Sequence, residues 1–131
     1  MFDVGVAGYL TKRHIVEQKG AEFGKAFEHF ILMEIVAYRS YAGKDFLINF
    51  WRTKTGLEVD FILGQAEVSV EIKGASRVDK RDIYGIGAFT EAFSPKKSIL
   101  VCNEKEKRMH GKIVITPWEI FLHDLWSGKI L

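Results

Sequence analysis

Two neighbouring segments determine how this chain folds: Glu58-Val59-Asp60-Phe61-Ile62-Leu63 and, after a short connection, Val68-Ser69-Val70-Glu71-Ile72-Lys73. Both have strand length, and side chains alternate between the two faces of a strand. The alternation predicts one apolar face made by Val59, Phe61 and Leu63 on the first strand and by Val68, Val70 and Ile72 on the second. Residues 64–67 make a tight connection, so we expect adjacent antiparallel strands. Pairing them with their apolar faces together brings Asp60, Glu71 and Lys73 to the other face.

The pattern along the rest of the chain predicts an α/β fold. A helix is expected from Ala21 to about Arg39, because Phe23, Phe27, Phe30, Ile31, Glu34 and Tyr38 recur at helical spacing. A strand over Phe46–Arg52 and a turn at Thr53–Gly56 precede the two strands above. A second helix is expected over Val78–Phe93, with Ser76 and Asp79 as an approximate capping box. Its Gly85 and Gly87 suggest close packing on the sheet.

The C-terminal third completes the pattern. We expect a strand over Ser98–Cys102, a charged loop from Asn103 to His110 and a short strand over Lys112–Ile115. Thr116 as the cap and Pro117 at the first helical position predict a last helix that ends at Gly128. The order predicts a sandwich: a three-stranded antiparallel meander, a helix and further strands form a mixed sheet, which helices flank. The second helix brings the next strand parallel to a member of the meander.

Composition narrows the class of protein. The chain has 131 residues, of which 47% are hydrophobic, and a net charge of +2 that does not favour any partner. The single cysteine, Cys102, lies in an apolar run and is expected to be buried. A chain with one cysteine has no internal disulfide, which fits a reducing cytoplasm. The sequence has no run of about 18 apolar residues, so it does not predict a membrane helix. The opening stretch, 1–20, is weakly patterned and is expected to be the end of an upstream region or a linker, with one domain over 21–131.

Two carboxylates and an ammonium on one sheet surface suggest metal-dependent hydrolysis of a phosphodiester. Carboxylate oxygens of Asp60 and Glu71 suit Mg²⁺ or Mn²⁺, and such a metal lowers the pKa of its bound water. The ammonium of Lys73 would orient that water and stabilise developing charge. Glu28 on the first helix would join them if that helix packs on the meander. The alternative is ordinary: Glu71 and Lys73 form a solvated strand pair, and Glu28 is an exposed helical carboxylate.

Several basic residues are candidates for binding the phosphates of a nucleic acid. Arg52 and Lys54 follow the first strand, Arg77, Lys80 and Arg81 open the second helix, and Lys96 and Lys97 precede the next strand. If they surround the acidic group, binding to nucleic acid would depend on salt. A solvated surface of mixed charge explains each of them equally well.

The ordered set Glu28, Asp60 and Glu71-Ile72-Lys73 resembles the PD-(D/E)XK phosphodiesterase superfamily. Longer segments resemble the uncharacterised C-terminal domain of prokaryotic AAA+ ATPases; they are Asp3–Val6, Phe23–Phe30, Phe50–Thr53, Glu58–Ile62, Val70–Lys73 and Pro117–Leu122. The resemblance implies a restriction-endonuclease-like fold, with Asp60 and Glu71 as metal ligands, Lys73 as the catalytic lysine and Glu28 as the helical acid. The sequence departs from full-length ATPases because it contains no G-x-x-x-x-G-K-[ST] motif.

Three functions follow as hypotheses. The first is a Mg²⁺- or Mn²⁺-dependent deoxyribonuclease module of an AAA+ ATPase. The second is a non-enzymatic DNA-binding or specificity module of that ATPase, and the third is a regulatory or oligomerisation domain that binds no nucleic acid. The expected partners are DNA and an AAA+ ATPase domain, in cis or in trans. A homodimer is compatible with the sequence, and the expected location is the cytoplasm.

Overall fold

The structure is a computed structural model that describes residues 21–131, so the upstream region or linker predicted over 1–20 lies outside the described residues. The chain separates into two compact units, Met1–Asp45 and Phe46–Leu131, which we describe one at a time. In the first unit, helix α2 spans Ala21–Tyr41, two residues longer than predicted. Its predicted stripe is confirmed, since all of its members are buried; they are Phe23, Phe27, Phe30, Ile31, Glu34 and Tyr38.

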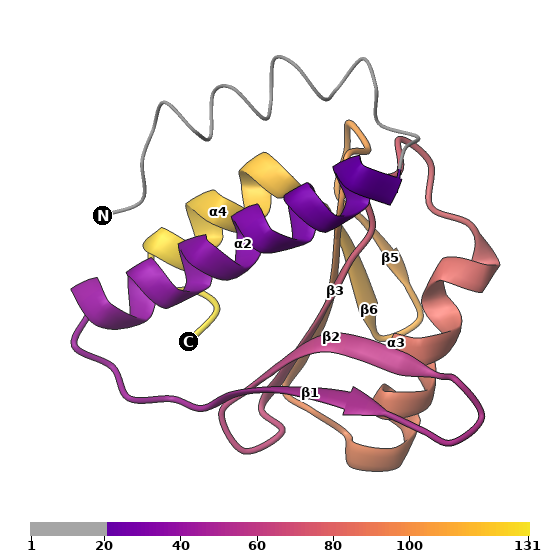
Figure 1. Ribbon diagram of the computed structural model, residues 1–131, viewed down its shortest axis with the longest axis horizontal. Coiled ribbons are helices and arrows are strands. Elements are labelled where there is room, and N and C mark those ends of the chain that lie inside the picture. Colours follow the sequence, from indigo (N-terminus) through magenta and orange to yellow (C-terminus); the bar gives the residue numbers. More distant parts are fainter. Residues whose placement is uncertain (1–20) are drawn as a thin grey trace. The chain divides into compact units, whose positions relative to one another are not determined.

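The second unit is built on a six-stranded mixed sheet (Figure 1). In chain order the strands are β1 (Ile48–Arg52), β2 (Glu58–Leu63), β3 (Val68–Ile72), β4 (Lys97–Cys102), β5 (Arg108–His110) and β6 (Ile113–Pro117). Their order across the sheet is β1-β2-β3-β4-β6-β5. The antiparallel meander β1-β2-β3 and the parallel pairing of β3 with β4 are both as predicted. The α/β fold with a mixed sheet is therefore confirmed.

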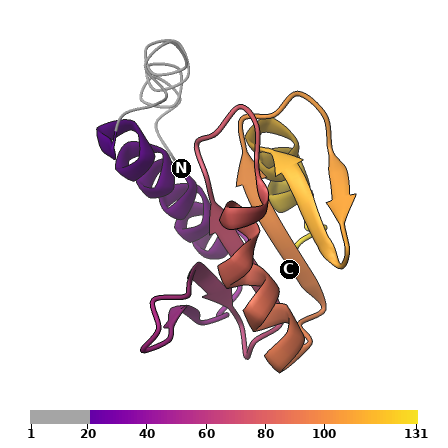
Figure 2. The same ribbon diagram turned by 90° about the vertical axis from the view of Figure 1, so that its right-hand side faces the viewer.

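Helices lie on both faces of this sheet. Helix α3 (Lys80–Phe93) packs on β2, β3, β4 and β6, and α4 (Trp118–Trp126) packs on β4 and β6. Figure 2 shows α3 in front of the strands and α4 behind them. The core between α3 and the sheet includes Ile83, Ile86 and Phe89 from the helix and Leu100 and Ile115 from the strands.

The helix caps differ from the sequence prediction. The cap of α3 is Asp79, whose side chain accepts hydrogen bonds from the backbone N–H groups of Arg81 and Asp82. The side chain of Asp82 accepts in turn from the N–H of Asp79, so the capping box is Asp79–Asp82 and the prediction of Ser76 is wrong. Helix α4 begins after Pro117 without a side-chain cap, and Thr116 is instead buried in β6.

The predicted loop 103–110 contains a strand that the sequence does not reveal. Residues Arg108–His110 form β5, which pairs antiparallel with β6 and makes one edge of the sheet. All three residues are exposed, so they lack the apolar alternation by which a strand is recognised. Gly111, with φ of 59°, takes the left-handed conformation at the turn into β6.

The strand β2 contains a bulge that changes which residues share a face. Asn49 pairs with Ile62 and Trp51 with Val59, so two steps along β1 match three steps along β2. Val59 therefore lies with Ile62 in the core under α3, and the predicted face of Val59, Phe61 and Leu63 is wrong. The bulge on β2 lies between Val59 and Ile62, so it includes Asp60 of the candidate site.

None of the helices in residues 21–131 combines the length and apolar character needed to cross a bilayer.

Candidate metal and phosphodiester site

The carboxylates of Asp60 and Glu71 each accept a hydrogen bond from a backbone N–H group of the neighbouring strand. The backbone N–H of Asp60 donates to Oε1 of Glu71 over 3.0 Å. The backbone N–H of Ile72 donates to Oδ2 of Asp60 over 2.7 Å. The paired residues of β2 and β3 end at Phe61 and Val70, beside the bulge in β2, and side chains take the place of ladder carbonyls beyond that point. The two acids are therefore held at one fixed point between neighbouring strands.

Glu71 lies on the face of the sheet that α3 covers. It is in register with Leu100 on the parallel strand β4, and registered side chains point to the same face. Leu100 belongs to the core under α3. Two residues earlier on β3, Ser69 donates to Ser98, whose hydroxyl bonds that of Thr90 on α3. Glu71 is consequently buried, with only 4% exposed, which contradicts the alternative in which Glu71 and Lys73 form a solvated pair.

Lys73 lies beside the two acids, on the side of the cluster that is exposed to solvent. Its Nζ lies 3.7 Å from Oε2 of Glu71, and its side chain is 39% exposed. Asp60 is half-buried. The structure thus brings together three of the predicted site residues, with Glu71 behind and with Asp60 and Lys73 toward solvent.

Burial raises the pKa of the Glu71 carboxyl to about 9. Loss of hydration is the largest cause, followed by the negative charge of Asp60 and by its hydrogen bond, while the nearby Lys73 ammonium acts in the opposite direction. At neutral pH Glu71 therefore carries a proton, which a bound cation would have to displace. A strongly shifted carboxyl beside a second carboxyl is typical of a functional site.

The segment that carries Lys73 is fixed to the loop after β4. The N–H of Lys73 donates to the carbonyl of Val101 over 2.9 Å, and the N–H of Asn103 donates to the carbonyl of Ala75 over 3.0 Å. Glu104 accepts from the N–H of Val78 over 2.7 Å and from two nitrogens of Arg108. Arg108 also donates to the carbonyl of Val78, so the backbone from 73 to 78 is held at both ends.

Two oxygen-bearing side chains, Asp60 and Glu71, are the protein groups here that could hold a hard divalent cation. Across residues 21–131, no group of three or more His, Cys, Asp or Glu side chains is gathered closely enough to bind a metal. The remaining positions around an ion would then be taken by water or by substrate oxygens, as is usual for Mg²⁺. Binding of Mg²⁺ or Mn²⁺ by this pair stays a prediction.

Glu28, the fourth predicted site residue, lies in the other compact unit. It is exposed on α2. Its role as the helical acid stays a prediction.

The predicted phosphate-binding residues are all exposed: Arg52, Lys54, Arg77, Lys80 and Arg81. Arg52 forms an ion pair of 3.2 Å with Glu58 and lies over the ring of Phe50. Arg81 pairs with its helix cap, Asp79, over 3.5 Å. The positive charge of Arg77 helps to lower the pKa of Glu104, so Arg77 lies toward the loop that holds the Lys73 segment. Their part in binding a substrate stays a prediction.

The sequence did not reveal the groups that support the site. Glu104 and Arg108 are four residues apart in a stretch that the sequence predicts to be a charged loop. Their hydrogen bonds to the backbone of Val78 become visible only in the folded structure. Cys102 behaves as predicted: it is fully buried, and burial raises the pKa of its thiol to about 11.

The fold and this cluster define an α/β domain in which a buried acid and a half-buried acid lie next to a lysine. Residues 23–121 match a family described as a domain of unknown function, DUF4143, and the chain belongs to that family. Comparison with curated proteins gave no match. Comparison with solved structures gave none either.

Proposed function

We propose that this domain is a divalent-metal-dependent phosphodiesterase that cuts DNA. The observation that carries the proposal is the fixed contact between Asp60 and Glu71 with the Lys73 ammonium 3.7 Å from Glu71. A pair of adjacent acids, one of them buried, is electrostatically unfavourable when both are ionised. A bound divalent cation would offset that repulsion and let both acids ionise.

The three side chains have distinct parts in the proposed reaction. Asp60 and Glu71 would hold Mg²⁺ or Mn²⁺, which supplies Lewis-acid chemistry at the scissile phosphate. The side chain of Lys73 is half-exposed, and its backbone is fixed by the hydrogen bond to Val101. The ammonium group would reach a water or a phosphate oxygen from this fixed position. As a compact cation it would stabilise the charge that develops on the phosphate.

Membership of an uncharacterised family supports a wider proposal about context. Because the sequence also resembles the C-terminal domain of AAA+ ATPases, we infer that an ATPase domain works with this one, in cis or in trans. The exposed cations Arg52, Lys54 and Arg77 would contribute the salt-sensitive part of DNA binding. Co-purification of the domain with an ATPase encoded beside it tests this context separately from the chemistry.

A cleavage assay tests the proposed activity. Fluorescently labelled single-stranded and double-stranded DNA would be incubated with the protein and Mg²⁺, Mn²⁺ or EDTA. We expect cutting only with metal, and a loss of at least about 100-fold in Asp60→Asn and Lys73→Met, equivalent to some 3 kcal/mol of barrier. Lys105→Met, which removes an exposed lysine from the loop after β4, is the matched control and should cut normally.

The same assay distinguishes the competing functions. DNA binding that persists in EDTA, without any cutting, would replace the enzyme with a DNA-binding module. Absence of both binding and cutting, together with association with the ATPase, would indicate a regulatory domain. Equal cutting by wild type, Asp60→Asn and Lys73→Met would show that a contaminating nuclease is responsible.

A further inference from the structure

A second candidate site lies on the opposite face of the sheet from the acidic cluster. There a cavity of about 410 Å³ opens between β4, β5, β6 and α4. Ile99 and Val114, which form its floor, are in register on β4 and β6. They alternate with Leu100 and Ile115, which belong to the core under α3. The cavity is therefore separate from Glu71, which shares the face of Leu100.

The rim of this cavity is strongly basic. Five lysines line it: Lys96, Lys97, Lys107, Lys112 and Lys129. Among the described residues that line it, Asp124 is the single acid. These lysines come from the starts of β4 and β6, from the loop before β5 and from the segment after α4, so the fold gathers charges that are far apart in the sequence.

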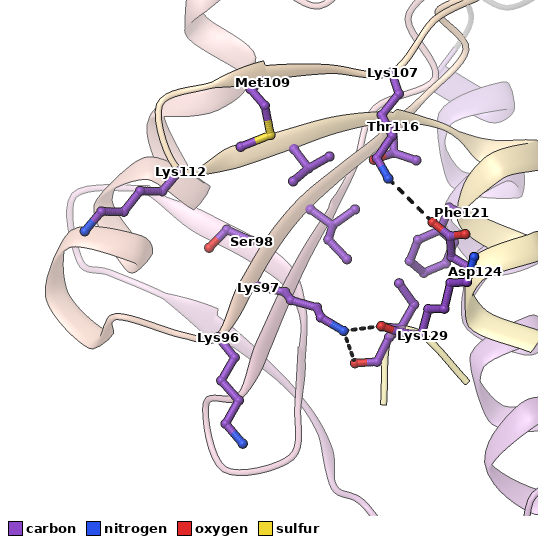
Figure 3. A pocket seen from close by; sticks show the side chains of 13 residues that line it. Lys96, Lys97, Ser98, Lys107, Met109, Lys112, Thr116, Phe121, Asp124 and Lys129 are labelled. Atoms are coloured by element: carbon purple, nitrogen blue, oxygen red, sulfur yellow. Dashed lines mark hydrogen bonds and ion pairs between the residues drawn. The ribbon is translucent and has the colours of Figure 1, made fainter. Parts of the chain in front are cut away.

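Three of the five ammonium groups already have partners in the protein. Lys107 pairs with Asp124 over 3.6 Å, and Lys96 pairs with Glu67 over 3.7 Å. Lys97 donates to the backbone carbonyls of Lys129 and Ile130, as the dashed lines in Figure 3 show. Within residues 21–131, no carboxylate side chain pairs with Lys112 or Lys129, which leaves two cations at the rim for an external anion.

The cavity joins an apolar floor to this basic rim. Phe121 of α4 and Met109 of β5 add to the floor, and Met109 is 60% exposed although it is a large apolar side chain. Figure 3 shows Met109 on one side of the hollow, Lys97 on another, and Lys96 and Lys112 extending from its margin. The volume falls within the roughly 300–1,000 Å³ of small-molecule sites, and positive charge around apolar walls attracts anions.

We propose that this cavity binds a small organic anion of about nucleotide size. Its apolar ring would lie on Ile99, Val114 and Phe121, and its phosphate or carboxylate would contact Lys112 or Lys129, which Figure 3 shows on opposite sides of the hollow. The flexible stems of these lysines let their ammonium groups turn toward such a ligand. Binding here does not depend on the metal site, because the two sites lie on opposite faces of the sheet.

Adenosine monophosphate is a suitable probe, measured against adenosine and inorganic phosphate as its separate halves. In calorimetric titrations we expect the nucleotide to bind at least about tenfold more tightly than either half, a difference of roughly 1.4 kcal/mol. Methyl NMR signals of Ile99 and Val114 should shift during the titration. Affinity should fall as salt is raised from about 20 to about 300 mM, because the Debye screening length then shortens from about 20 to about 6 Å.

Charge-reversal variants locate the site. Of Lys112→Glu and Lys129→Glu, both on exposed residues, the variant beside the bound anion should weaken binding about tenfold or more, since it replaces an attraction with a repulsion. Lys105→Glu makes the same change of charge outside the cavity and should alter affinity less than about twofold because of screening. Asp60→Asn should leave binding unchanged, which keeps this result independent of the nuclease assay.

Three results would overturn the proposal. The first is nucleotide binding no tighter than that of phosphate, because the apolar floor would then have no role. The second is an equal loss of affinity in Lys105→Glu, Lys112→Glu and Lys129→Glu, which would indicate non-specific attraction. The third is an absence of heat and of methyl shifts at millimolar nucleotide.

Discussion

The backbone carbonyl of Glu58 occupies the position that a Cβ atom on Gly85 would need. Helix α3 therefore lies directly against the start of β2, two residues before Asp60. A glycine in a helix interior costs about 1 kcal/mol relative to alanine, and here the close approach of the two backbones explains its presence. The neighbouring Gly87 is different, because a Cβ atom there would meet Ile83 and Ile113 at an ordinary 3.9 Å.

This difference gives a prediction about stability. Gly85→Ala should destabilise the fold by about 1–3 kcal/mol, because α3 must move away from β2 to admit the methyl group. Gly87→Ala should be neutral or stabilising by up to about 1 kcal/mol. Urea unfolding of the two variants and wild type measures both effects, and equal stability of the two variants would contradict the packing described.

The buried carboxyl of Glu71 predicts an unusual dependence of stability on pH. Its pKa is about 9 in the folded protein, against an ordinary 4.5, so the folded state holds its proton more tightly than the unfolded state. The resulting stabilisation is complete below pH 4.5 and is lost as pH rises toward 9. The free energy of unfolding should fall over that range. Glu71→Gln cannot ionise and should flatten the decline, whereas Glu91→Gln, on the exposed side of α3, should keep it.

The Glu104–Arg108 pair should matter for the segment that carries Lys73. Glu104→Ala leaves the N–H of Val78 and the guanidinium of Arg108 without their shared acceptor, at a cost of about 1–3 kcal/mol in urea unfolding. The hydrogen bond from Arg108 holds the pKa of Glu104 below its usual range, so this contribution is present at neutral pH and disappears in acid. Glu106→Ala, an exposed neighbour, should cost little. A similar loss in both variants would show that the network does not stabilise the fold.

The cap of α3 can be assigned by one pair of variants. Asp79→Ala should lower the free energy of unfolding by about 0.5–2 kcal/mol, since it removes the acceptor for two helix N–H groups. Ser76→Ala should change it much less. Thermal or urea unfolding compares the two, and the reverse order would restore the cap expected from the sequence.

Much of the architecture follows from local pattern. The meander, the helix that crosses from β3 to β4 and the buried stripe of α2 were predicted, because hydrophobic periodicity reports the face that an element buries. Caps were less certain, since Ser76 and Asp79 are both good capping residues and tertiary packing decides between them. The strand β5 was missed because an exposed edge strand needs no apolar alternation.

The candidate site shows the same limit. The meeting of Asp60, Glu71 and Lys73 was predicted, but on the assumption of two regular strands. The bulge in β2 brings Asp60 and Glu71 into contact by a different route, and nothing in the residue types marks its position. The burial of Glu71 depends on α3, and the Glu104 network depends on a loop 26 residues from Val78. Such long-range relations have no local signal.

Binding of Mn²⁺ at neutral pH, followed by calorimetry in buffers of different ionisation enthalpy, tests the central claim most directly. We predict one ion per chain and release of about one proton, because Glu71 must give up the proton that it holds below pH 9. Affinity should rise with pH, and Asp60→Asn and Glu71→Gln should abolish binding while Lys105→Met does not. Absence of binding at millimolar Mn²⁺, or binding that both acidic variants retain, would contradict the account.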